Sequence, residues 1–349
     1  MNLQTKRKLK IAGLVLLLLT LFGEIAFLSM ELLGKKSMLG QSGETVEMTV
    51  PELENAQVEV DGDYIIYNGE KYLYNENITS ILCMGIDKEA HDENAEKYGI
   101  AGQADMLMLA ILDTETGKVK LWNISRDAMT EVDIYNVDGE FVRREQLQAC
   151  LAFAYGDGSH ESCENTVKAV SRLFYGIPIQ SYAALDMEAI QPLNDAIGGV
   201  EVTIHEGDIL PARFQPGTTV LLKGQDARAY VQSRRTELPD EALDSNNNRM
   251  ARQRQYMTKF INKALQMTKE DLSTPITLFN IARDGEHLVT NLNVSRVAYL
   301  ATILTKVNFT EESLQTIPGE VVAGKEHAEY HVDDEALYQM ILDTFYVKQ

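Results

Sequence analysis

The chain has 349 residues, of which 45% are hydrophobic and 24% are charged, so it can form one large or two ordinary domains with a substantial core. Its 32 basic and 52 acidic residues give a formal net charge of -20. General nucleic-acid binding needs a cationic surface to displace counterions, so this charge argues against it. We therefore expect no nucleic acid among its partners.

An apolar run, with LVLLLLTLFG at its centre, occupies most of residues 11–33. At about 1.5 Å per residue it can cross a hydrocarbon core of roughly 30 Å. Four cations precede it, and positive residues stay inside: Lys6, Arg7, Lys8 and Lys10. The pattern predicts a cytoplasmic tail over 1–10 and a signal anchor over 11–33. The protein would be a single-pass type II protein of the cell membrane with an extracellular C-terminal domain. The alternative is a cleaved signal peptide, but SMELLGKK contains no convincing cleavage site.

Residues 34–77 are interpreted as an extracellular stalk that ends in a small hairpin. The first part is polar with little periodicity. In DYIIYNGEKYLYNEN, two β-prone runs flank Asn68-Gly69, the dipeptide that favours a type I′ turn.

From Ile78 onward, apolar runs alternate with helical segments, which predicts an α/β fold in which helices sandwich a mixed sheet. Strands are expected over 80–87, 105–112, 118–125, 181–186 and 198–204, and helices over 163–174 and 187–197. The first three runs are almost continuously apolar, as in strands that are covered on both faces.

Several catalytic motifs are missing from the sequence. It has no G-x-x-x-x-G-K-[ST] loop, no G-x-G-x-x-G after a strand, no H-E-x-x-H and no G-x-S-x-G. This argues against a P-loop nucleotide hydrolase, a zinc enzyme and a serine hydrolase of the elbow type.

Polar residues close or open three of the predicted strands. Asp87 ends the first, Asp105 opens the second, and Arg126-Asp127 follows the third. Open α/β sheets bind ligands at strand ends, where two carboxylates could hold a divalent cation or accept a proton and Arg126 could hold an anion. The alternative is that these residues only cap strands and form turns.

Six arginines lie between Gly224 and Gln255, in a chain that is otherwise acidic: Arg228, Arg234, Arg235, Arg249, Arg252 and Arg254. Arginine suits bidentate binding of phosphate or carboxylate. A helix predicted from Asn247 onward would place Arg249, Gln253, Tyr256 and Phe260 on one face, with Arg252 beside it. A charged helix with its arginines in solvent remains the alternative.

The chain has three cysteines. Cys83 lies in an apolar run and is expected to be a buried thiol. Cys150 and Cys163 could pair, but the sequence alone does not decide this.

The order of these segments resembles the LytR-CpsA-Psr proteins of bacterial cell-wall assembly. The resemblance covers about residues 78–349 and rests on these motifs: ILCMGID (81–87), ADMLMLAILD (104–113), NISRDA (123–128), AYGDG (154–158), DAIGGVEVTI (195–204), LKGQDARAYVQSRR (222–235) and NRMARQRQ (248–255). It implies an α/β/α sandwich with a hydrophobic pocket for a polyprenyl chain. It also implies Mg²⁺-assisted transfer of a glycopolymer from a polyprenyl-pyrophosphate carrier to peptidoglycan.

Carried over by position, the resemblance implies that Asp87 and Asp105 bind the metal and serve catalysis. Arg126 and Arg249 are implied in catalysis and in pyrophosphate binding, and three further residues in pyrophosphate binding: Arg234, Arg235 and Gln253. The chain departs from the family pattern at Gln103 and Gln232, where arginine is usual, and at Asn246, where aspartate is common. Two functions therefore stay open, a membrane-anchored phosphotransferase and a weakly or non-catalytic polyprenyl-phosphate-binding scaffold or regulator of wall assembly.

Overall fold

The computed structural model describes residues 29–38, 46–51, 53, 57–61, 64–86, 101–205, 210, 213–233, 239–324 and 327–349, with the backbone alone over 239–247 and at 311. Most of the predicted anchor, Asp87, Arg234 and Arg235 lie outside these residues. No helix in the described part of the chain is both long and apolar enough to cross a membrane.

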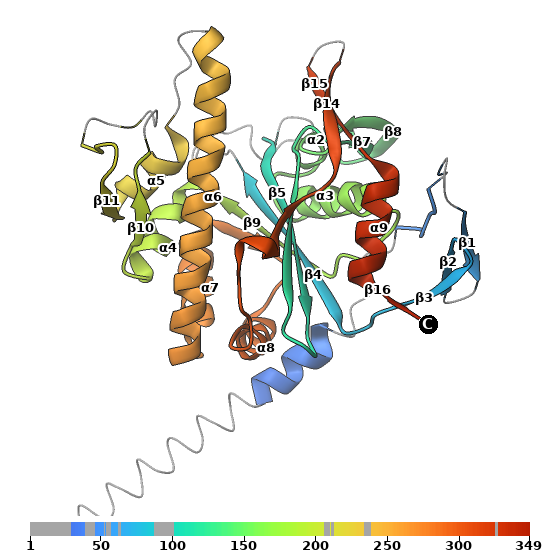
Figure 1. The fold of residues 1–349 in the computed structure, drawn as a ribbon, viewed down its shortest axis with the longest axis horizontal. Coiled ribbons are helices and arrows are strands. Elements are labelled where there is room, and N and C mark those ends of the chain that lie inside the picture. Colours follow the sequence, from blue (N-terminus) through green and yellow to red (C-terminus); the bar gives the residue numbers. More distant parts are fainter. Residues whose placement is uncertain are drawn as a thin grey trace, which may run out of the picture.

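A mixed six-stranded sheet forms the centre of the molecule, as the sequence predicts (Figure 1). Its strands lie in the order β12 (Leu288–Thr290), β9 (Ser181–Asp186), β4 (Ile78–Ile86), β5 (Ala104–Asp113), β6 (Val119–Ile124) and β13 (Leu314–Thr316). Strand β4 runs parallel to β9, and β6 runs parallel to β13. The pairs β4–β5, β5–β6 and β9–β12 are antiparallel.

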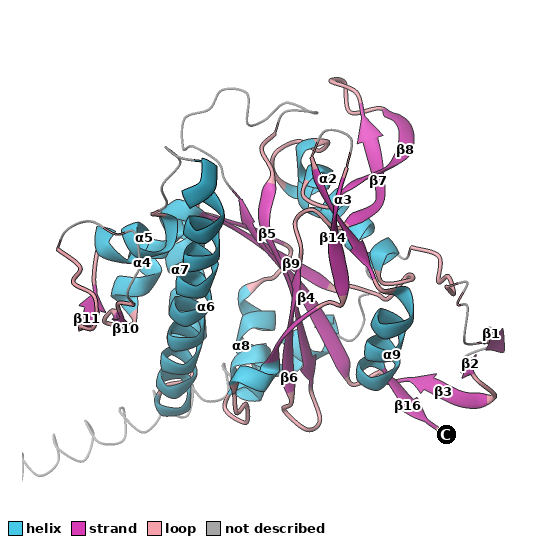
Figure 2. Ribbon diagram, turned by 45° about the horizontal axis from the view of Figure 1, so that its top comes forward, coloured by secondary structure: helices cyan, strands magenta, loops and turns pink. Residues whose placement is uncertain are grey.

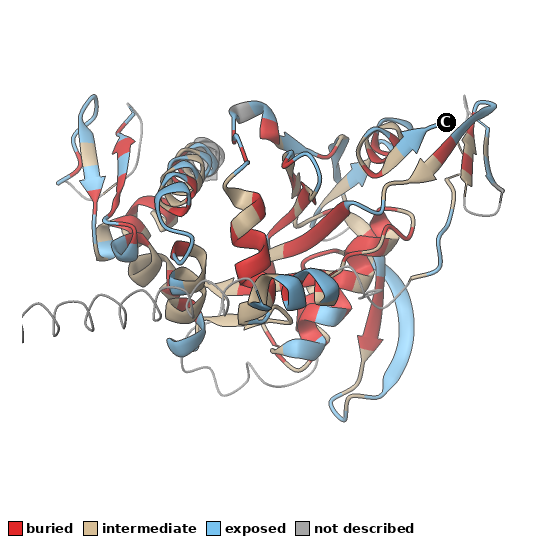
Figure 3. Ribbon diagram, turned by 90° about the horizontal axis from the view of Figure 1, so that it is seen from below, coloured by how far each residue is buried: buried red, intermediate tan, exposed pale blue. Residues whose placement is uncertain are grey.

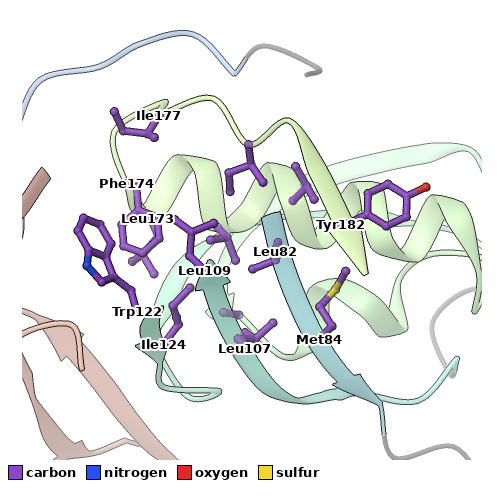
Figure 4. Close-up of a cluster of buried hydrophobic side chains, with 14 of the residues drawn as sticks. Leu82, Met84, Leu107, Leu109, Trp122, Ile124, Leu173, Phe174, Ile177 and Tyr182 are labelled. Atoms are coloured by element: carbon purple, nitrogen blue, oxygen red, sulfur yellow. The ribbon is translucent and has the colours of Figure 1, made fainter. Parts of the chain in front are cut away.

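Helices cover both faces of this sheet, which explains why its central strands β4 and β5 are almost continuously apolar. On one face α2 (Leu151–Ala154), α3 (His160–Leu173) and α9 (Asp334–Phe345) enclose the largest core cluster. Figure 4 shows Leu82, Leu107 and Trp122 of this cluster between the strands and α3. The other face packs against α8 (Val294–Leu304) and the long helix α6 (Pro239–Glu270). The predicted α/β/α sandwich is therefore present.

Beside the sandwich, a smaller cluster forms around α6 (Figure 2). It contains the 3-10 turn η1 (Met187–Ala189), α4 (Ile190–Ala196), α5 (Gln225–Gln232) and the hairpin of β10 (Val200–Thr203) and β11 (Thr219–Leu222), with α7 (Thr274–Asp284) next to α6. Helix α6 begins at Pro239, eight residues before the predicted start at Asn247. Proline is favoured in the first turn of a helix, whereas the apolar periodicity used for the prediction begins only later.

The predicted hairpin is confirmed by β2 (Tyr64–Tyr67) and β3 (Glu70–Tyr74), which pair antiparallel. Asn68 and Gly69 have φ values of 52° and 80°, the left-handed pair that a type I′ turn needs. The hairpin is part of a four-stranded sheet with β1 (Val58–Asp61) and β16 (Tyr346–Lys348), and it packs on α9.

Parts of the chain before the hairpin also lie against the sandwich. The helix over residues 29–38 packs on α8, where Met38 is buried and Arg296 Nε donates to Ser37 Oγ at 2.9 Å. At Gly34, a Cβ atom would lie 2.0 Å from the carbonyl oxygen of Ser295, so only glycine allows this close approach. Further along, Thr49 N donates to Tyr175 O at 3.0 Å. The described part of the interpreted stalk is thus held by tertiary contacts.

Two hairpins stand at one end of the sandwich, one of β7 (Met129–Tyr135) and β8 (Phe141–Gln148), the other of β14 (Gly319–Ala323) and β15 (Ala328–Val332). β8 and β14 are largely exposed, in contrast to the buried central strands (Figure 3). A bridge between Ala128 and Tyr330 joins the two hairpins.

Candidate active site at the edge of the sheet

Asp105 and Arg126 meet at one edge of the central sheet. Because β5 is antiparallel to both β4 and β6, its start lies beside the ends of these two strands. Asp105 lies at an irregularity in the register between β5 and β4, and Arg126 lies in the turn after β6. The Arg126 guanidinium lies beside Cys150, the residue directly before α2. The pair therefore lies next to α2, on the side of the sheet that α2 and α3 cover.

The Arg126 guanidinium joins several side chains at this edge. It pairs with the Asp105 carboxylate through Nη1 and donates to Gln103 Oε1 through Nη2. Its Nη2 also lies 3.6 Å from Cys150 Sγ, and its Nε lies 3.7 Å from Asp127 Oδ1. Arg126 and Asp105 are 38% and 40% exposed, so a ligand can reach both charges. Gln103 thus serves as an acceptor for Arg126.

Contacts with distant segments hold the backbone around Arg126. Cys150 N donates to Arg126 O at 3.0 Å, Gln148 Nε2 to Asp127 Oδ1 at 3.0 Å, and Tyr330 N to Asp127 O at 2.8 Å. Sequence reasoning missed Gln148, Cys150 and Tyr330 as members of this site. No motif marks them, because the contacts join segments that are up to about two hundred positions apart.

All three cysteines are free thiols, so Cys150 and Cys163 do not pair. Burial raises the pKa of the Cys150 thiol, although the charge of Arg126 opposes this shift. At neutral pH the thiol is therefore protonated, and Cys150 acts as a neutral neighbour of Arg126 rather than as a nucleophile.

The side chains of the arginine-rich segment, residues 224–255, have different roles. Arg252 is only 1% exposed, and its guanidinium donates to the backbone carbonyls of Tyr230, at 2.9 Å, and Ser233. It therefore fastens α6 to the end of α5 instead of binding a ligand. Gln253 Nε2 donates to Val231 O at 3.2 Å, next to the same contact.

Arg249 lies one helical turn before Gln253 on α6, as predicted. The N-terminal half of α6 extends toward the end of the molecule where β5 begins (Figures 1 and 2). The predicted companions Arg234 and Arg235 lie outside the described residues, as does Asp87. Asp105 and Arg126 are thus the predicted site residues that the structure places in direct contact.

A metal at this edge would have Asp105 as its described carboxylate ligand. No group of three His, Cys, Asp or Glu side chains in the described part of the chain is arranged to hold a metal ion. Mg²⁺ commonly binds through one or two carboxylates together with substrate phosphates, so the exposed Asp105 carboxylate beside Arg126 fits this mode.

Solved structures share the fold. Bacillus subtilis TagV superposes with a TM-score of 0.53 at 21% identity, covering 77% of this chain and 95% of TagV. A TagT structure bound to LIIa-WTA gives 0.52 at 21% identity, covering 76% of this chain and 89% of TagT. A Streptococcus agalactiae protein, gbs0355, gives 0.57 at 19% identity, covering 78% and 90% of the two chains.

Two curated relatives match this chain over only about half of their own length. Biofilm regulatory protein A of Streptococcus mutans is 24% identical over 242 residues, which cover 67% of this chain and 54% of that protein. The polyisoprenyl-teichoic acid–peptidoglycan teichoic acid transferase TagU of Bacillus anthracis is 27% identical over 195 residues, which cover 56% of this chain and 55% of TagU. The chain thus spans about half the length of these relatives. The model of the LytR_cpsA_psr family matches residues 38–344, which is most of the chain, so the chain belongs to that family.

Proposed function

We propose that this protein is a membrane-anchored extracellular phosphotransferase that moves a glycopolymer from a polyprenyl-pyrophosphate carrier to peptidoglycan. The observation that carries the proposal is the Arg126–Asp105 pair, a fixed cation beside an accessible carboxylate at the ligand edge of an α/β sheet. Family membership and the name of the TagU relative support the substrate class.

The chemistry requires a phosphate-binding cation and a proton acceptor. A hydroxyl oxygen of the acceptor attacks the phosphorus atom nearer the saccharide, and the bond from that phosphorus to the bridging oxygen breaks. Polyprenyl phosphate leaves with the bonding electrons. The Asp105 carboxylate takes the hydroxyl proton, and Arg126, together with Arg249, Arg234 and Arg235, offsets charge on the phosphates.

Asp105, together with Asp87, would hold Mg²⁺ in this proposal. When bound, the ion neutralises charge on phosphate oxygens. Arg126 keeps the Asp105 carboxylate in one orientation, and Gln103 keeps the guanidinium in place.

Replacing Asp105 with asparagine should weaken Mg²⁺ binding and slow transfer, because the amide carries no negative charge and does not accept the proton. We expect the Mg²⁺ concentration for half-maximal rate to rise about tenfold, in line with the loss of one charged ligand. The measurement is a Mg²⁺ titration of transfer, with Asp138→Asn, in the exposed turn between β7 and β8, as the matched control. An unchanged titration in folded Asp105→Asn would remove the metal assignment.

Turnover tests the function itself. The full chain in liposomes, given a polyprenyl-pyrophosphate-linked saccharide, Mg²⁺ and peptidoglycan fragments, should release polyprenyl phosphate and yield the linked saccharide.

A scaffold is the second candidate, because Gln103 and Gln232 stand where the family has arginine. Gln232 Oε1 accepts from Arg228 Nε at 2.8 Å, so its amide is held on α5. Binding of the lipid donor without turnover, in both the native protein and Gln232→Arg and with several donor saccharides, would favour the scaffold.

The cellular location is part of the same proposal. Protease added to intact cells should remove the chain beyond Lys36, and protection of the whole chain would contradict an extracellular domain.

A further inference from the structure

A cavity of about 1080 Å³ lies apart from the Arg126–Asp105 pair. Strands β7, β8 and β15, the end of α3, the start of α9 and residues 46–50 form its walls. The volume lies slightly above the range of roughly 300 to 1,000 Å³ that is usual for small-ligand sites, so it can hold several sugar rings.

The cavity begins close to the catalytic edge. Met129 and His331 line it. Met129 follows Asp127 by two residues, and His331 directly follows Tyr330, whose N–H donates to Asp127 O at 2.8 Å. Three residues of chain span at most roughly 11 Å, so the near wall at Met129 lies within about that distance of Arg126. One extended ligand can therefore reach both places.

An ion-pair network fixes one wall of the cavity. Asp133 is 4% exposed and accepts from Arg144 Nε and from Arg172 Nη2, both at 2.7 Å. Arg172 Nη1 also donates to Glu131 O at 3.2 Å. Each guanidinium carries five N–H groups, so both arginines retain donors beyond these bonds while their positions are set.

The charges on the described walls nearly balance. The lining includes three cationic side chains, those of Arg144, Arg172 and Lys168. It also includes four carboxylates, those of Glu47, Glu131, Asp133 and Asp334. A polyanion would meet more negative than positive groups here, so the cavity is a poor site for a pyrophosphate. Thr49, Gln146 and the ring of Tyr175 add uncharged donors, acceptors and an aromatic surface, which suit a neutral ligand with many hydroxyl and amide groups.

We propose that this cavity binds the acceptor glycan, as a short run of N-acetylated amino sugars, and directs its free hydroxyl toward Arg126 and Asp105. The inference rests on the proposed function, because it names the acceptor subsite of the same transfer.

Gln146 offers a way to block the cavity without disturbing the core. It is an exposed residue of β8 that lines the cavity, whereas its neighbour Glu145 points to the opposite side of the strand. In the full-length protein, Gln146→Trp should weaken binding of the uncharged tetramer of N-acetylglucosamine at least tenfold, measured by titration calorimetry. Glu145→Trp is the matched control and should bind as the native protein does. His331→Ala, on another wall, should weaken binding severalfold.

Equal binding by Gln146→Trp and Glu145→Trp, or no binding by the native protein, would overturn the assignment. Binding of the peptidoglycan stem peptide in place of the sugar would overturn it as well. The two proposals fail separately. Cavity-dependent sugar binding without any turnover of the lipid donor would contradict the transferase proposal and support this binding site. Turnover with the same acceptor KM in Gln146→Trp and Glu145→Trp would support the transferase and contradict this binding site.

Discussion

Replacing Arg126 with alanine is expected to slow glycopolymer transfer by a factor of about 100 to 1,000, the usual effect of removing one preorganised donor from developing charge. The guanidinium pairs with Asp105 and donates to Gln103. In the proposed mechanism, its loss removes a phosphate contact and releases the carboxylate that would accept the proton. The measurement is kcat/KM for the lipid donor, because the lost contact acts mainly in the transition state.

Arg126→Lys should recover only part of the rate, since an ammonium group cannot bridge Asp105 and Gln103 with one planar fork. The control is Arg143→Ala on β8, which removes an exposed ion pair with Glu145 and should leave the rate unchanged. The Arg126 assignment would be wrong if Arg126→Ala transferred at the native rate, or if its loss merely followed a loss of folded protein.

Replacing Arg252 with alanine should lower the free energy of unfolding by about 3 kcal/mol or more. Most arginines lie at the surface and contribute little to stability, but Arg252 is buried. The change removes a buried side chain and leaves the carbonyls of Tyr230 and Ser233 without this donor. Each buried group that loses its partner costs about 1 to 3 kcal/mol, and the space left behind adds to the loss. Urea unfolding followed by circular dichroism measures the effect as a shift in midpoint.

Arg254 is the matched control, because it lies two residues further along α6 and is exposed. Arg254→Ala should change the unfolding free energy by no more than about 0.5 kcal/mol. Equal midpoints for the two variants would show that the Arg252 contacts do not stabilise the packing of α5 on α6.

Local patterns were sufficient to predict the framework of this protein. The continuous apolar runs predict the central strands and their coverage on both faces, and Asn68-Gly69 predicts the hairpin turn. The ends of the runs also predict that Asp105 and Arg126 lie at neighbouring strand ends, where the structure brings them into contact. These predictions succeed because side-chain periodicity and turn geometry depend on a few neighbouring residues.

Tertiary structure alone decided which charged residues are structural and which are accessible. Arg252 and Arg254 are indistinguishable in sequence, yet one is buried against α5 and the other is exposed, because a helix turns by about 100° per residue. The contact of Gln103 with Arg126, the packing of residues 29–38 on α8, and the cavity beside β7 all join segments that are far apart in the chain. Such contacts follow from how complete layers pack together, which no local pattern encodes.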